Sequence, residues 1–288
     1  MCDDDIHPGL VVDPTVSRRT LGLGAAALAS LAAATAANAQ AKLVEKDVAI
    51  KTPDGTSDSV FIHPEGRGPW PAVLLWTDIM GLRPVKREMG KRLAAQGYAV
   101  LVVNPFYRSH TAPVMPGDIN FGDPATRATL MGYRQKMTDA GIDADSVAYV
   151  AWLDAQPQVN KRKKVGVQGY CMGGPLSVRT AAAVPNRIGA VGSFHGGGLV
   201  TAQPSSPHLL VAKTNAEYLV CVAQTDDARA PNDKEVLKKT FADTGKTGNV
   251  HVHPADHGWC VPGSQVYNQA EAEKAWAELS AMYKRALA

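Results

Sequence analysis

The sequence has few cysteines, few aromatic residues and almost no excess of charge. Four cysteines in 288 residues are too few for the dense disulfide framework of small secreted domains, so each one is interpreted from its neighbours. Thirty Lys and Arg residues against 27 Asp and Glu give a formal net charge of +3, which does not favour nucleic acid as a partner. A hydrophobic fraction of 45% and a charged fraction of 20% exclude disordered, collagen-like and coiled-coil chains.

Long apolar runs are also absent from the sequence, apart from one near its beginning. The pair Arg18-Arg19 precedes a run rich in Ala, Leu and Gly over residues 21–37, which ends in Ala37-Asn38-Ala39. These three features are typical of a twin-arginine signal peptide. We predict that residues 1–39 are this signal, bound transiently by the export machinery, and that residues 40–288 form a periplasmic domain. A membrane helix is the alternative, but the run is short and Ala-rich, so we expect no stable membrane span after cleavage.

Removal of the predicted signal leaves three cysteines, Cys171, Cys221 and Cys260. Because this number is odd, at least one thiol has no disulfide partner within the chain. A disulfide between Cys221 and Cys260 is an alternative for the other two, although their spacing in sequence does not fix their distance. The presence of this unpaired thiol must be explained by a function other than disulfide formation within the chain.

Strand-like and helix-like segments alternate along the rest of the chain. A turn signal, Pro53-Asp54-Gly55, predicts a short antiparallel hairpin at the start. Apolar runs then predict strands at 71–76, 99–103, 164–168, 188–193, 218–223 and 250–253. Helical spacing predicts helices at 85–96, 124–140, 143–155, 172–183, 233–243 and 269–287. This order predicts one α/β domain with a mostly parallel central sheet flanked by helices on both faces, and we interpret residues 201–215 as a surface loop.

The segment with the strongest chemical signal is Gly169-Tyr170-Cys171-Met172-Gly173-Gly174, between a predicted strand and a predicted helix. Its spacing, Gly-x-nucleophile-x-Gly, predicts a nucleophile elbow, in which glycines allow a strained turn. At the N-terminus of a helix the backbone dipole favours a thiolate, and the N–H of Met172 points to the position of a developing oxyanion. A buried and inert cysteine in a glycine-rich turn is the alternative.

An elbow nucleophile needs a base and an acid, which α/β-hydrolases supply in the chain order nucleophile, acid, histidine. Asp226 and Asp227 follow the strand predicted at 218–223, and His257 follows the strand predicted at 250–253. The carboxyl ends of parallel strands meet at one edge of a sheet, so these side chains can converge above Cys171. Spacing alone does not separate the two aspartates.

From residue 71 to residue 259 the sequence resembles the dienelactone hydrolases, α/β-hydrolases with a Cys, Asp, His triad, most specifically over residues 169–174. The resemblance implies a hydrolase that cleaves a small-molecule ester or lactone with Cys171 and His257, and it implies neither a cofactor nor a metal ion. The family places a proline four residues after its catalytic aspartate. Pro231 stands four residues after Asp227, which favours Asp227 over Asp226.

The same resemblance implies supporting groups. In the family an acidic residue after an early strand interacts with the resting thiol, and the next backbone N–H completes the oxyanion hole. Asp78 and Ile79 occupy these positions, with Asp78 one methylene shorter than the usual Glu. Arg108 matches the first of two arginines that hold a substrate carboxylate, while the second has no match. We interpret Arg127, on a predicted helix, as a surface residue.

Two other groups of histidines are interpreted as structural. The segment Phe194-His195-Gly196-Gly197-Gly198 is similar to the oxyanion motif of lipases, but it follows the nucleophile instead of preceding it. We therefore expect His195 at most to line the pocket. His251 and His253 share one face of a predicted strand, as alternation in a strand often produces, so we predict no metal site there.

The main alternative function is an exported protein that uses its thiols and histidines for binding or redox chemistry without ester turnover. A Cys-x-x-Cys pair would support this reading, and the sequence contains none.

Overall fold

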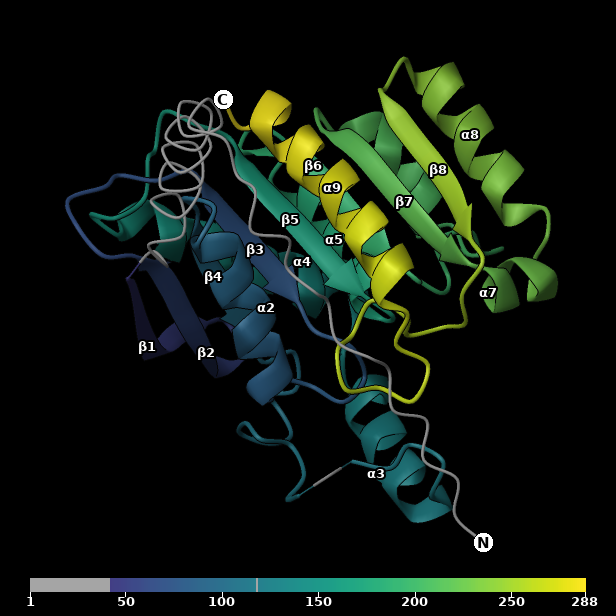
Figure 1. Ribbon diagram of the computed structural model, residues 1–288, viewed down its shortest axis with the longest axis horizontal. Helices are drawn as coiled ribbons and strands as arrows, with labels where there is room; N and C mark the ends of the chain where they lie inside the picture. The colour runs from purple at the N-terminus through teal and green to yellow at the C-terminus, as the bar shows by residue number, and fades with distance from the viewer. Residues whose placement is uncertain (1–41, 118) are drawn as a thin grey trace, which may run out of the picture. The chain divides into compact units, whose positions relative to one another are not determined.

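The computed structural model describes residues 42–117 and 119–288, so the predicted signal peptide lies outside the described residues. The described strands form one sheet in the order β1-β2-β4-β3-β5-β6-β7-β8 (Figure 1). Strands β3 to β8 are parallel to one another, and β2 joins β1 and β4 in antiparallel pairs. The strand bounds are β1 Leu43–Thr52, β2 Gly55–Pro64, β3 Ala72–Trp76, β4 Ala99–Val103, β5 Val165–Tyr170, β6 Ile188–Phe194, β7 Glu217–Ala223 and β8 Gly248–His253.

The helices alternate with the parallel strands. Their bounds are α2 Pro84–Ala94, α3 Pro124–Gln135, α4 Asp139–Ala155, α5 Gly173–Ala183, α6 Pro207–Leu210, α7 Gln224–Arg229, α8 Asp233–Thr244 and α9 Gln269–Ala286. Local chemistry fixes several ends: the side chain of Asp123 caps α3, that of Asn268 caps α9, and α8 ends at Gly245 with a φ of 64°.

Two apolar layers cover the sheet. Helices α2 and α9 pack on one face, and α4, α5 and α8 pack on the other (Figure 1). Every residue of β3, β4, β5 and β6 is buried, which explains why these strands have continuous apolar runs instead of an alternating pattern. The predicted α/β fold is therefore confirmed.

Apart from shifted ends, of which the largest is that of the helix predicted at 124–140, which ends at Gln135, the structure differs from the expectation in two segments. The segment predicted as a loop at 201–215 contains α6 and a 3-10 turn, Val211–Lys213. Helix α7 was not predicted, because its six residues are mostly polar and too short to show helical periodicity. Both segments connect elements that were predicted, so the topology is unchanged.

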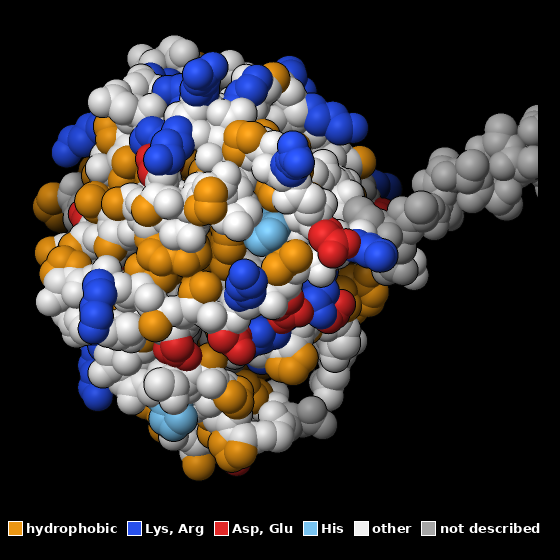
Figure 2. Space-filling view, turned by 90° about the vertical axis from the view of Figure 1, so that its left-hand side faces the viewer, with side chains coloured by type: hydrophobic (Ala, Val, Ile, Leu, Met, Phe, Trp, Pro, Cys, Tyr) orange, Lys and Arg blue, Asp and Glu red, His pale blue; other side chains and the backbone are white. Residues whose placement is uncertain are grey.

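None of the helices in the described part of the chain combines the length and the apolar character that crossing a bilayer requires. On the face shown in Figure 2, Lys and Arg side chains are spread over the surface and mixed with apolar and acidic ones.

Candidate active site

The predicted site residues meet at the carboxyl edge of the parallel sheet. The loop after β3 contains Asp78, β5 leads directly into Cys171, β6 into His195, and the segments after β7 and β8 contain Asp226 and His257. Loops at this edge can converge because the strands run in the same direction. The fold thus brings together residues that lie far apart in the sequence.

The turn at Cys171 has the geometry of a nucleophile elbow. Cys171 has a φ of 54°, in the left-handed region that a residue with a side chain rarely adopts. A Cβ on Gly169 would lie 1.9 Å from the carbonyl oxygen of Gly173, so only glycine fits there. The N–H of Cys171 lies 3.0 Å from the carbonyl oxygen of Phe194 and 3.1 Å from Nδ1 of His195. These contacts hold the strained backbone in place.

The two expected oxyanion donors lie on adjoining segments. A Cβ on Gly173 would lie 2.7 Å from the carbonyl oxygen of Thr77, so the start of α5 abuts the loop that contains Ile79. In the described residues, neither the N–H of Ile79 nor that of Met172 makes one of the turn or loop hydrogen bonds. Both donors are therefore available to an oxygen of a substrate.

His257 pairs with Asp226. Nδ1 of His257 lies 2.7 Å from Oδ2 of Asp226, and the N–H of His257 donates to the hydroxyl of Thr225 at 3.0 Å. Asp227 points elsewhere: its two carboxylate oxygens accept hydrogen bonds from Nζ of Lys234 at 2.7 Å. The expected pairing of His257 with Asp227 is wrong, because residues 224–229 form a helix whose turn directs neighbouring side chains apart.

The surroundings of His257 favour its charged form. Burial lowers the pKa of the imidazole, but hydrogen bonds to Asp226 and to Cys171, together with their negative charges, raise the pKa to about 10. A protonated imidazole beside the sulfur is the partner that a thiolate requires. Asp226 therefore pairs directly with His257, and Cys171 is close enough to His257 to raise the pKa of the imidazole.

Asp78 does not occupy the role that the resemblance implies. Oδ1 of Asp78 accepts a hydrogen bond from Arg83 at 2.6 Å and Oδ2 lies 2.8 Å from Nζ of Lys86. The N–H of Met80 also donates to Oδ1, at 3.0 Å. Burial alone would raise the pKa of Asp78, but Lys86 and Arg83 hold it well below its usual range. Among the described contacts Asp78 makes no hydrogen bond to Cys171, because the two cations hold its short side chain.

Arg108 is also engaged elsewhere. Its Nη1 and Nη2 donate to the two carboxylate oxygens of Asp145, at 2.7 and 2.9 Å, and its Nε donates to Asp54 at 2.8 Å. Asp145 is only 2% exposed, so this is a buried ion pair between the β4–α3 loop and α4. The expectation that Arg108 binds a substrate carboxylate is corrected, because its guanidinium is already occupied. Arg127 is exposed on α3.

His195 is more deeply involved than expected. It is buried beside the elbow, and its ring meets that of His257 edge to face at 4.8 Å between centroids. Burial, with the charges of His257 and Lys86, lowers the pKa of His195 well below its usual value. Because Nδ1 accepts from the N–H of Cys171, the neutral ring carries its proton on Nε2.

The remaining histidines and cysteines have structural environments. His253 lies 2.9 Å from Glu271 and His251 3.3 Å from Glu278, so both face α9. No group of three metal-ligating side chains is arranged to hold an ion within residues 42–117 and 119–288. Cys221 and Cys260 are free thiols, so the alternative of a disulfide between them is wrong for this structure. Burial raises the pKa of both thiols, which makes them poor nucleophiles.

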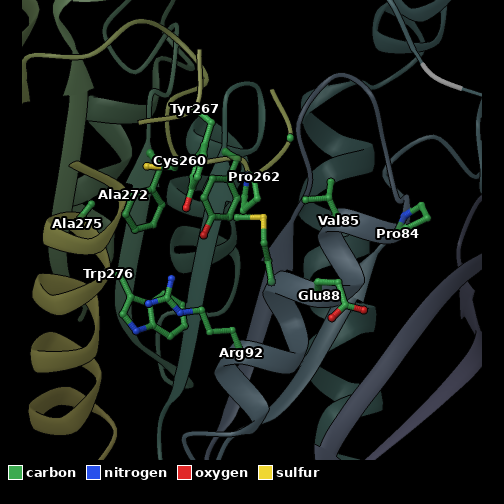
Figure 3. Close-up of a pocket in the computed structure, with 14 residues that line it drawn as sticks. Pro84, Val85, Glu88, Arg92, Cys260, Pro262, Tyr267, Ala272, Ala275 and Trp276 are labelled. Atoms are coloured by element: carbon green, nitrogen blue, oxygen red, sulfur yellow. The ribbon is translucent and has the colours of Figure 1, made fainter. Parts of the chain in front are cut away.

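Two cavities open near this edge of the sheet. One, of about 480 Å³, is lined by His257, Asp226 and the glycines 196–198. The other, of about 490 Å³, lies between α2 and α9, with Arg92 beside Trp276 and Cys260 on its wall (Figure 3). Cys171 lines neither cavity, whereas Asp226 and His257 line the first and not the second, so the first one is the candidate substrate site.

Two residues of the site were missed by the sequence analysis. Arg83 and Lys86 bind Asp78, and the side chain of Lys86 is fully buried. Arg83 carried no recognisable signal. Lys86 could have been recognised from helical spacing. Residues 86, 90, 93 and 94 share the buried face of α2, and a lysine on such a face is unusual.

The chain resembles known proteins in sequence. The sequence model of the dienelactone hydrolase family matches residues 58–287. A carboxymethylenebutenolidase of Rhodococcus opacus is 30% identical over 194 residues, which is 67% of this chain and 71% of that protein.

Solved structures share the fold. A structure described as a dienelactone hydrolase, from Klebsiella pneumoniae, superposes with a TM-score of 0.73 at 20% identity, covering 85% of this chain and 99% of that one. The dienelactone hydrolase-like promiscuous phosphotriesterase P91, from metagenomic libraries, superposes with a TM-score of 0.70 at 21% identity over the same shares of the two chains.

The pairing of His257 can be tested by NMR titration of the imidazole. We expect a pKa of about 10 in the unaltered protein, and Asp226→Asn should lower it by about 1 to 3 units, because it removes the charge beside Nδ1. Asp227→Asn is the matched control and should leave the pKa unchanged. A fall in the pKa with Asp227→Asn but not with Asp226→Asn would contradict the assignment.

The role of Arg108 can be tested by urea denaturation. Arg108→Gln leaves the buried carboxylate of Asp145 without its partner and should lower the free energy of unfolding by about 3 to 5 kcal/mol. Arg127→Gln, at an exposed position, should change it by less than about 0.5 kcal/mol. If Arg108→Gln leaves the unfolding midpoint unchanged, the ion pair with Asp145 does not stabilise the fold.

Proposed function

Because the chain belongs to the dienelactone hydrolase family and is a carboxylic ester hydrolase, we propose that it cleaves an ester or lactone through the thiolate of Cys171, with His257 as base and acid and Asp226 as its orienting carboxylate. The observation that supports this most is the chain of interacting groups at the elbow: Asp226 is hydrogen-bonded to His257, and Cys171 is close enough to His257 to raise its pKa. Such a chain activates the sulfur and fixes the tautomer of the imidazole.

In the first half of the reaction, the sulfur of Cys171 attacks the carbonyl carbon. The carbonyl oxygen becomes an oxyanion, which accepts hydrogen bonds from the N–H groups of Ile79 and Met172. When this intermediate collapses, the bond to the leaving oxygen breaks and the imidazolium of His257 protonates that oxygen. The products are an alcohol, or the freed hydroxyl end of an opened lactone, and a thioester on Cys171.

In the second half, neutral His257 takes a proton from water, and the resulting hydroxide attacks the thioester carbon. The same two N–H groups hold the second oxyanion. Its collapse breaks the bond between carbon and sulfur, releases the carboxylic acid and restores the thiolate of Cys171 beside protonated His257. Asp226 stabilises the imidazolium in both halves without taking a proton itself.

The cavity beside His257 indicates a small-molecule substrate. A volume of about 480 Å³ is within the range of sites for small ligands. The family resemblance indicates Arg108 as the cation that binds a substrate carboxylate, but Arg108 is paired with Asp145 and Asp54. A carboxylate on the substrate is therefore not required. We therefore propose neutral esters and lactones as the first substrates to test.

The alternative, a thiol and histidine protein without turnover, is less well supported. Of the three described cysteines, Cys221 and Cys260 are buried and Cys171 lies beside His257. A redox function would require a second thiol within reach of the first, and Cys171 has none as a partner in the described residues.

Replacement of the nucleophile tests the proposal. Cys171→Ala should abolish turnover of an activated aryl ester, because no sulfur is left to form the thioester, while the thermal unfolding transition stays in place. Cys260→Ala is the matched control and should keep its activity. Activity retained by the Cys171→Ala protein would refute the mechanism, and a panel of lactones and aryl esters would then define what the protein cleaves.

We also propose that the protein is exported to the periplasm after folding. The support is the sequence pattern over residues 1–39, which lies outside the described residues. The oxidising compartment is compatible with the structure, because Cys221 and Cys260 are buried.

The export proposal is tested in a bacterial host that has the twin-arginine machinery. The unaltered protein should reach the periplasm with Gln40 as its first residue, as N-terminal sequencing would show. Replacement of Arg18 and Arg19 by Lys should leave the uncut chain in the cytoplasm, since the pair is what the machinery recognises. Periplasmic delivery of the Lys-Lys variant at the normal level would contradict the proposal.

A further inference from the structure

A fully buried lysine lies close to the nucleophile without a part in the mechanism above. The side chain of Lys86, on α2, is 0% exposed, and its Nζ lies 2.8 Å from Oδ2 of Asp78. Its other close neighbours are the ring of Tyr170, with Nζ 4.5 Å from the centroid, and Sδ of Met89, at 3.9 Å. A lysine is almost never fully buried unless its charge is compensated.

Asp78 does not compensate this charge alone, because two cations share it. Arg83 donates to both carboxylate oxygens of Asp78, at 2.6 and 3.0 Å, and its side chain is only 13% exposed. In the part of the chain that the structure describes, no second carboxylate forms an ion pair with Arg83 or with Lys86. The cluster of Asp78, Arg83 and Lys86 therefore has one positive charge in excess.

This cluster lies directly against the elbow. Tyr170, whose ring lies under Nζ of Lys86, is the residue before Cys171, and Asp78 is the residue before Ile79. The start of α5 touches the backbone of Thr77, since a Cβ on Gly173 would lie 2.7 Å from its carbonyl oxygen. The charge of the Cys171 sulfur is within reach of Lys86, since it contributes to the pKa of this lysine. The other thiol within reach of Lys86, Cys260, is held neutral because burial raises its pKa.

We propose that Lys86 is a positioning residue that stabilises the thiolate of Cys171 through its charge, a role that complements His257. The inference rests on the proposed function only in taking Cys171 as the nucleophile. When the proton of the Cys171 thiol moves to His257, the imidazolium is balanced by Asp226. The new negative charge on sulfur is balanced by the excess charge of the cluster.

The charged groups around Cys171 agree with this arrangement. Asp226 is paired with His257, Asp78 with two cations, and His195 is neutral. The pKa of Lys86 is lowered, mainly by burial and also by the charge of Arg83, while Asp78 and Cys171 act against this lowering and favour the charged form. Since coupling between two charges is reciprocal, the lysine that the sulfur stabilises also stabilises the thiolate.

The pH dependence of alkylation by iodoacetamide, with the modified peptide identified by mass spectrometry, measures the thiolate of Cys171 directly. In Lys86→Met the midpoint of the alkylation profile should rise by about 1 to 3 pH units relative to the unaltered protein. In Lys86→Arg, which keeps the charge, the midpoint should stay close to that of the unaltered protein. Lys91→Met, at a partly exposed position of the same helix, is the control and should leave the midpoint unchanged.

If Lys86→Met does not fold, Arg83→Met tests the same balance, because it also reduces the cluster to zero net charge while Lys86 keeps its partner. Its midpoint should rise as well. A folded Lys86→Met or Arg83→Met protein with an unchanged midpoint would overturn the inference. This outcome is distinct from failure of the proposed function, in which the midpoint at Cys171 rises in Lys86→Met as expected and yet the unaltered protein cleaves none of the esters and lactones.

Discussion

The site depends on one strained residue, Cys171, held in a left-handed backbone conformation at the end of β5. This conformation lifts the sulfur above the edge of the sheet and points the N–H of the next residue toward the same space. The strain persists because the surroundings allow no alternative: Gly169 and Gly173 permit contacts that no larger residue could make. The backbone of Cys171 is also held by Phe194 and His195 on the neighbouring strand.

Electrostatics then decides what the strained residue can do. The charge of the sulfur acts on His257, which pairs with Asp226, and on Lys86, which pairs with Asp78. The first accepts the thiol proton and the second, in our proposal, balances the charge that remains on sulfur. The carboxylate that the family resemblance places on the thiol thus acts at a distance here, because it holds two cations in position instead of contacting the sulfur.

The fold could be predicted from the sequence because buried parallel strands leave continuous apolar runs and helices leave a period of 3.6 residues. The elbow and His257 could be predicted because glycine spacing and chain order are local properties. The choice between Asp226 and Asp227 could not, since it depends on the turn of a six-residue helix with no periodic signal. The partners of Arg108 are 54 and 37 residues away in sequence, so its ion pairs could be recognised only in the tertiary structure.

The central claim is that the sulfur of Cys171 becomes acylated during turnover. The most direct measurement is mass spectrometry of the protein quenched in the steady state with an activated aryl ester, followed by peptide mapping. We expect the added mass of one acyl group on the peptide that contains Cys171. An acyl group on another residue, or steady turnover with no covalent adduct when deacylation is slowed at low temperature, would contradict it.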